Sequence, residues 1–122
     1  MIPGHVAIYV ATGPVDLRWS FDVLSGVVKE RIQQDPRAGA LFVFLNKRRN
    51  RVKVLFYDRT GYCMLYKRLD RGTFPMPVVI SPGAEHVVIS SAELDLILLG
   101  LDVPPSPRAR RVSTKKSSTQ IH

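Results

Sequence analysis

The chain has 122 residues, enough for one domain with a modest core and too few for two ordinary domains. Its hydrophobic content of 45% excludes wholesale disorder, and no apolar run is long enough to cross a bilayer, so no membrane partner is expected. The formal net charge of +8 at pH 7 favours a polyanionic partner.

The amino terminus lacks the basic and apolar segments of a secretory signal, so we expect a cytoplasmic protein. Residues 6–12 are rich in β-branched and aromatic side chains, which predicts a mostly buried strand closed by Gly13 and Pro14. A helix is predicted next, with Asp16 as its N-cap and its end near Gln34. Apolar residues at spacings of three or four define its buried face: Leu17, Phe21, Leu24, Val28 and Ile32.

A three-stranded antiparallel meander is predicted in the middle of the chain. Residues 41–45 (LFVFL) are apolar throughout, which indicates a central strand covered on both faces. A polar and basic link leads to an alternating strand over residues 52–58, and a tight turn at Gly61 leads to a third strand over residues 62–69. Cys63 is the one cysteine, which excludes an intrachain disulfide, and we expect it to be a buried strand residue.

The last part of the domain is predicted to contain short elements. Two short strands are expected over residues 78–80 and 87–89. Ser90 precedes Glu93 with the spacing of a capping box, so a short helix should follow and end near Gly100.

The expected fold class is α+β, in a single small domain over residues 1–103. A mixed or antiparallel sheet is centred on the meander, one main helix packs on it, and a short C-terminal helix follows. Residues 104–122 combine prolines, hydroxyl residues and basic clusters with little to bury, so we expect a flexible, disordered basic tail.

Positive charge is concentrated in residues 47–71, which hold nine of the eighteen Lys and Arg residues against two acids. Residues 72–102 hold four acids and no base, and residues 103–122 hold five bases and no acid. Such segregation favours DNA as a partner, although Lys also protects sheet edges and part of the block could be a solvated face. The predicted nucleic-acid-binding residues are Lys47, Arg48, Arg49, Arg51, Lys53, Arg59, Lys67, Arg68, Arg71 and Arg18.

Tyrosines interleave with these cations. Tyr57 and Tyr66 are candidates for stacking on exposed bases, or equally for packing against neighbours with a wet hydroxyl. The acidic segment over residues 72–102 could also fold back over the basic face and mask it.

Arg18 and Trp19 are predicted to lie in the first turn of the first helix, where a cation opposes the helix dipole. Arg18 could hold an anion together with backbone N–H groups, or form a salt bridge with Asp16 or Asp22, and we favour the salt bridge. Trp19 is either a core residue or a hydrophobic contact for a partner.

The residues that could support catalysis are sparse, so we expect a protein that is not an enzyme and binds no metal or cofactor. The histidines (His5, His86 and His122) lack metal-ligand spacing, and no Gly-x-Ser-x-Gly elbow occurs. A metal-dependent nuclease, for which Asp58 is the residue to test, is the weaker alternative because convergent carboxylates are few.

Three segments, in order and spacing, resemble the Orf2-like (TnpB) accessory proteins of the sixty-six-type bacterial insertion sequences: ATGPVDLRWSFDVL, LFVFLNKRRNRVKVLFYDRTGYCMLYKRLDRGTFPMP and SSAELDLILLGLD. The resemblance covers about residues 1–103 and implies a role in DNA transposition beside a separate transposase. DNA and the cognate transposase are the partners that it implies. A DNA-binding accessory protein and an adaptor that binds the transposase without contacting DNA both fit it.

This sequence departs from the family pattern at several positions. Trp19 and Ser20 stand where a basic residue and a glycine are usual, and Tyr57 and Met76 stand where tryptophans are usual. The basic tip of the hairpin, residues 47–51, is retained.

Overall fold

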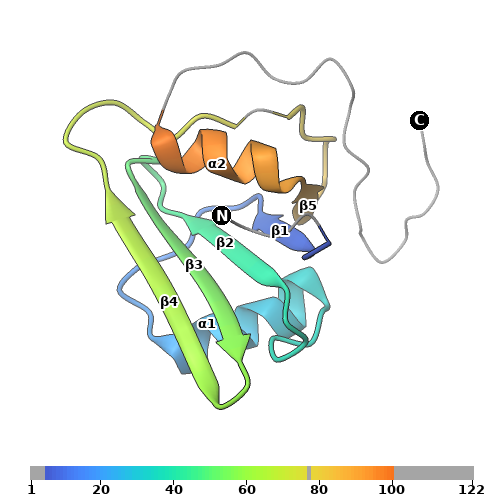
Figure 1. Ribbon diagram of the computed structural model, residues 1–122. Coiled ribbons are helices and arrows are strands. Elements are labelled where there is room, and N and C mark those ends of the chain that lie inside the picture. The colour runs from blue at the N-terminus through green and yellow to red at the C-terminus, as the bar shows by residue number, and fades with distance from the viewer. Residues whose placement is uncertain (1–4, 77, 101–122) are drawn as a thin grey trace.

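The computed structural model describes residues 5–76 and 78–100, which fold around a five-stranded sheet (Figure 1). The order across the sheet is β4-β3-β2-β1-β5, with β1 parallel to β2 and the other neighbouring pairs antiparallel. The predicted α+β class is confirmed, and the sheet is mixed. Its strands are β1 (Ile8–Ala11), β2 (Leu41–Leu45), β3 (Arg51–Asp58), β4 (Gly61–Arg68) and β5 (His86–Ile89).

The parallel pair β1–β2 results from a helical crossover. Parallel neighbours cannot be joined by a tight turn, so the chain must cross one face of the sheet between them. Here the crossover is α1 (Phe21–Val27) continued by a π-helical turn, η1 (Val28–Ile32). Strands β2, β3 and β4 then form the predicted antiparallel meander, in which Val43 faces Val54 and Leu55 faces Met64.

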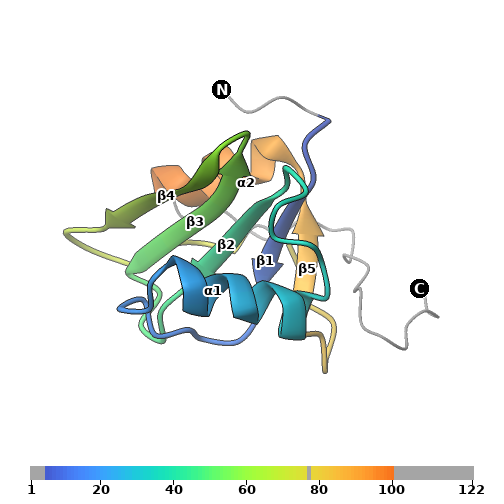
Figure 2. The same ribbon diagram turned by 90° about the horizontal axis from the view of Figure 1, so that it is seen from below.

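Strand β2 is buried on both faces, as its continuous apolar run predicts. Val43 and Leu45 belong to a core cluster that includes residues of α2 (Ser91–Leu99), whereas Phe42 and Phe44 belong to the cluster formed with α1 and η1. The two helical layers therefore cover opposite faces of the sheet, with α1 in front of the strands and α2 behind them in Figure 2.

The first helix begins later than predicted, because Asp16 forms a local turn instead of an N-cap. Its Oδ1 accepts the backbone N–H of Arg18 at 2.9 Å, and its carbonyl accepts that of Trp19 at 3.0 Å, which closes a single turn that does not continue as a helix. The helix starts at Phe21 after Ser20, and Phe21 is 41% exposed, not buried as expected. The other four residues of the predicted apolar face are buried: Leu17, Leu24, Val28 and Ile32.

The end of this helix lies close to the predicted Gln34. The backbone N–H of Gln33 donates to the Val28 carbonyl at 2.7 Å, a five-residue spacing that closes a wide turn. Gln33 itself has φ 61°, a left-handed conformation that ends the helix.

Two smaller expectations are wrong. Residues 78–80 form no strand, and only Val79 makes an isolated bridge, because the prolines around this segment cannot donate to a ladder. Cys63 is in a strand but only half-buried, since β4 is the edge of the sheet, and its thiol contacts Asp58 Oδ2 at 3.6 Å. The domain boundary at residue 103 and the tail over residues 104–122 lie outside the described residues.

Helix α2 has both of its predicted end signals. The Glu93 backbone N–H donates to Ser90 Oγ at 3.1 Å, and the Ser90 backbone N–H donates to Glu93 Oε1 at 2.8 Å, which completes a capping box. Gly100 follows the helix with φ 75°, and a Cβ on it would lie 2.9 Å from Leu69 Cδ2.

Removal of the cap should destabilise the domain. We expect Ser90→Ala to lower the free energy of unfolding by about 1 kcal/mol, since it removes the acceptor for one backbone N–H at the helix start. Urea unfolding followed by circular dichroism measures the change. Ser91→Ala, one residue later, is the matched control and should change stability by no more than about 0.5 kcal/mol.

His86 is a buried polar residue of the core, 1% exposed on β5. Neither of its ring nitrogens makes a hydrogen bond of ordinary geometry among the described residues, and its ring meets Tyr9 edge-on at 5.7 Å between centroids. Burial lowers the pKa of His86, against smaller opposing effects of Glu85 and of a backbone group of Arg31.

A buried neutral histidine makes stability depend on pH. The unfolded chain takes up a proton at this site at a higher pH than the folded chain does, so stability should fall as the pH drops below the ordinary histidine value of about 6.5. Urea unfolding between about pH 5 and 7.5 tests this, since most carboxyl groups stay ionised there. His86→Leu should flatten the dependence, whereas His5→Gln, at an exposed position, should leave it. An imidazole of His86 that titrates by NMR at or above the ordinary value would contradict this account.

Candidate nucleic-acid interface

An open cleft of about 440 Å³ lies at the end of the sheet where β3 begins. Its walls are the loop between β1 and α1 and the turn between β2 and β3, and strand β4 contributes the side chain of Tyr66. Four of the lining residues are cations and one is an acid. The lining residues are Pro14, Val15, Asp16, Leu17, Arg18, Asn46, Lys47, Arg48, Arg51 and Tyr66.

Backbone and amide hydrogen bonds hold the two walls. The Val15 N–H donates to the Leu45 carbonyl at 3.0 Å, which ties the first loop to the end of β2. In the turn, Asn46 Oδ1 accepts the backbone N–H groups of Asn50 at 3.1 Å and Arg51 at 2.9 Å. The amide of Asn46 thus takes the place of a backbone group, and the turn presents exposed cations on a fixed frame. Sequence analysis missed this role of Asn46, although Asn at the start of a tight turn is a usable signal.

Arg18 forms the predicted salt bridge with Asp16. Arg18 Nη2 lies 2.8 Å from Asp16 Oδ2, and Arg18 Nε donates to Oδ1 at 3.0 Å. Hydrogen bonds from Arg18 lower the pKa of Asp16 from 3.8 to about 2. Arg18 lies in the loop before α1 and not in the helix, so it does not oppose the helix dipole. Its side chain is 89% exposed, and the bonds to Asp16 leave Nη1 for another acceptor.

Four predicted residues share one face of the β3–β4 hairpin. Arg51 pairs with Arg68, and Lys53 pairs with Tyr66, so all four side chains point to the α1 side of the sheet. Lys53 Nζ lies 5.2 Å from the centroid of the Tyr66 ring and donates to the Trp19 carbonyl at 3.2 Å. Lys53 therefore braces the ring and the first loop, while Tyr66 is 52% exposed.

Arg71 lies at the same end of the sheet. The loop that carries it begins where the Leu69 N–H donates to the Asn50 carbonyl and ends where the Phe74 N–H donates to the Arg49 carbonyl. Arg71 is exposed between these two anchors.

Three other predicted cations are directed elsewhere. Arg49, with φ 60°, donates from Nη2 to the Phe74 carbonyl at 3.3 Å and so anchors the loop after β4. Lys67 Nζ donates to the Leu98 carbonyl and caps the end of α2. Arg59 lies in the β3–β4 turn, about 25 Å from the cleft along an eight-residue strand.

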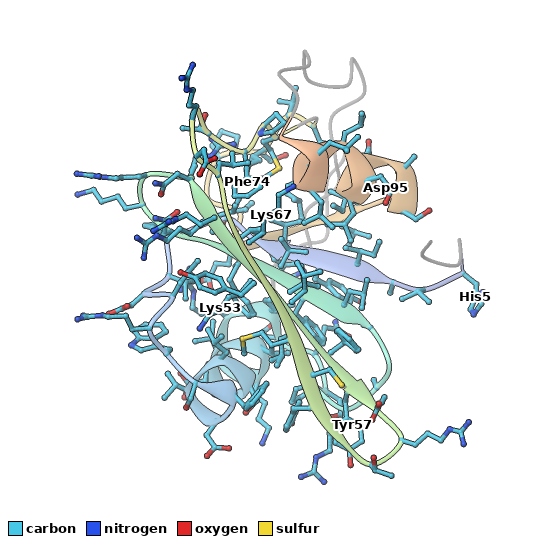
Figure 3. The ribbon with its side chains drawn as sticks, turned by 60° about the vertical axis from the view of Figure 1, so that its left-hand side comes forward. His5, Lys53, Tyr57, Lys67, Phe74 and Asp95 are labelled. Atoms are coloured by element: carbon cyan, nitrogen blue, oxygen red, sulfur yellow. The ribbon has the colours of Figure 1, made fainter. Side chains whose placement is uncertain are left out.

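Tyr57 lies far from the cleft, near the β3–β4 turn. Its ring meets that of Tyr62 edge-on at 5.1 Å, and the Arg37 guanidinium lies 5.4 Å from its centroid. The structure therefore does not bring Tyr57 together with Tyr66. Figure 3 shows Tyr57 far from Lys53, the residue that lies over the Tyr66 ring.

Comparison with known proteins identifies the family. The sequence model described as "IS66 Orf2 like protein" matches residues 6–107. The chain belongs to the IS66 Orf2-like family. Two proteins of Sinorhizobium fredii are similar to it. The uncharacterized protein y4hO is 38% identical over 104 residues, covering 84% of this chain and 88% of that protein, and the uncharacterized protein y4jC is 38% identical over 95 residues, covering 78% and 79%. No solved structure matches the chain.

Family membership confirms the resemblance predicted from three sequence segments. An IS66 Orf2-like protein is an insertion-sequence-associated accessory protein, and the family is not a known class of enzymes.

Two of the residues expected to depart from the family pattern, Trp19 and Met76, pack against the core. Trp19 is half-buried against the core cluster on the α1 side, and its carbonyl holds Lys53. Met76 packs against the cluster on the α2 side.

The acidic segment of this IS66 Orf2-like protein does not cover the cleft within the described residues. Glu85 precedes β5, at the opposite edge of the sheet from β4. Glu93 and Asp95 are carried by α2, on the face of the sheet away from the cleft, and Figure 3 shows Asp95 far from Lys53. Asp102 lies outside the described residues.

Neither a metal centre nor a membrane span is found in the described part of the chain. Residues 5–76 and 78–100 contain no group of three or more His, Cys, Asp and Glu side chains that could hold a metal ion. None of the helices in these ranges is both long and apolar enough to cross a membrane.

The Asp16–Arg18 pair can be tested by titration. We expect the Asp16 carboxyl to titrate in NMR with a pKa of about 2. Arg18→Ala should move this pKa up towards its ordinary value, because the main hydrogen-bond donor is lost. Lys29→Ala removes an exposed cation outside the cleft and should leave the Asp16 titration where it was. Equal shifts in the two variants would show that net charge, and not the pair, controls this group.

Proposed function

We propose that this IS66 Orf2-like protein is a non-catalytic transposition factor that binds DNA through the cleft and assists a separate transposase. One observation carries the proposal, namely that separate parts of the chain bring cations to one end of the sheet. The loop before α1 supplies Arg18, the β2–β3 turn and the first residue of β3 supply three more, and the end of β4 with its loop adds two: Lys47, Arg48, Arg51, Arg68 and Arg71.

Few acids oppose this charge. Asp16 lines the cleft but is paired with Arg18, and Asp70 lies in the loop after β4. Crowded cations repel one another, and an anion such as a phosphate relieves that repulsion. Lys and Arg bind phosphates without reading bases, so this surface supports affinity more than sequence preference.

Salt dependence is the direct test of the proposal. If about five phosphates are neutralised on duplex DNA, the logarithm of the binding constant should fall with the logarithm of salt concentration at a slope of about −4 to −5. The double variant Arg48→Ala, Arg51→Ala removes two contacts, so the slope should weaken by about 2 and the affinity at about 0.1 M salt should fall by about 50-fold. Fluorescence anisotropy with labelled DNA measures both quantities.

The control variant removes the same charge elsewhere. Lys29→Ala, Arg59→Ala changes two exposed cations that do not line the cleft, and its affinity and slope should stay near those of the unchanged protein. Equal losses in the two double variants would contradict a localised DNA contact, and a flat salt response in the unchanged protein would contradict DNA binding by this cleft.

A second candidate function is that of an adaptor for the transposase. The outer edge of β4 has no strand partner among the described residues, and Leu65 on it is 44% exposed. An open edge can add a strand from another protein. Co-purification with the transposase after nuclease treatment tests this function, and failure of the two proteins to associate at low salt would end it.

A further inference from the structure

Tyr66 differs from the other three tyrosines of the chain. Tyr9 stacks on Phe42 at 5.6 Å between ring centroids, and Tyr57 and Tyr62 pack on each other. Tyr66 makes no ring–ring contact among the described residues, although it is 52% exposed on the edge strand β4. Its ring is nevertheless held, by Lys53 beside it and by a long contact of 3.5 Å from Arg51 Nη1 to its hydroxyl.

The residues of the cleft match the chemistry of a nucleotide. Lys53 lies over the Tyr66 ring, and Tyr66, but not Lys53, lines the cleft. The same cleft is lined by the apolar residues Pro14 and Val15 and by the side chains of Arg48 and Arg51. A flat apolar group with an anion beside it is the chemistry of a nucleotide, and about 440 Å³ falls in the range of small-ligand sites.

We propose that the cleft binds single-stranded DNA, with one base stacked on Tyr66 and the adjoining phosphates bound by Arg48 and Arg51. In a duplex the faces of the bases are covered by their neighbours, so an aromatic side chain cannot stack on them without unstacking the duplex. An unpaired base exposes its face, and stacking on an aromatic side chain tolerates any base. This inference rests on the proposed function, because it specifies which form of DNA the same cleft prefers.

Stacking and phosphate binding differ in their salt dependence, which separates the two contributions. Stacking releases no counterions, so Tyr66→Ala should lower the affinity for a single strand of about twelve nucleotides by about tenfold or more while the salt slope stays unchanged. Tyr66→Phe keeps the ring and should bind like the unchanged protein. The affinity of Tyr66→Ala for the duplex of the same sequence should change by less than about twofold, since phosphate contacts carry it.

The experiment compares both forms of DNA with the Tyr66 variants and with Arg48→Ala, Arg51→Ala. Tyr66→Leu, which keeps an apolar side chain on the strand, and thermal unfolding of each variant show whether any loss comes from misfolding. Preference for the single strand, together with a loss in Tyr66→Ala and Tyr66→Leu that Tyr66→Phe restores, supports the inference.

Two results would overturn it. Equal affinity for the two forms with no effect of Tyr66→Ala, while the arginine double variant still weakens binding, refutes the single-strand preference and leaves the proposed function intact. Absence of binding to either form refutes both.

Discussion

Burial of β2 on both faces is the constraint on which the rest of the structure depends. Every side chain of LFVFL from Phe42 onward is buried, so the sheet must be covered on two sides. One cover is the crossover helix between β1 and β2, and the other is α2 with the loop before it. Strand β2 itself therefore carries no charged side chain, and the cations that line the cleft lie at one end of the sheet.

Local signals made much of the fold predictable. Three features depend on neighbours in sequence, and the structure has all of them. They are the helical spacing of Leu24, Val28 and Ile32, the apolar run over residues 41–45, and the capping box at Ser90. The start of the first helix was wrong because Asp16 has two local options, a cap and a turn, and propensity does not choose between them. The parallel pairing of β1 with β2 joins residues more than thirty positions apart, and strand periodicity holds no information about such a partner.

The sequence predicts which residue types form the candidate site, but not where in the fold their side chains lie. A dense run of cations in the meander was visible in the sequence, yet alternation along β3 and β4 sends them to different faces. Lys67 turns to α2 and Arg49 to the loop at Phe74, whereas Arg18 joins the cleft from a distant segment because Val15 is bonded to Leu45. These assignments depend on tertiary contacts between segments that the sequence does not mark as neighbours. Part of the positive charge therefore stabilises the domain, and part remains available to a ligand.

The end of α2 depends on a residue of the basic block. Lys67 lies on the edge strand β4, and its Nζ donates to the Leu98 carbonyl near the end of this helix. Leu69, just after β4, lies beside Gly100. The edge strand and the helix on the far face of the sheet are thereby joined by a charge-assisted hydrogen bond, so a change in either element would be felt at the end of the other.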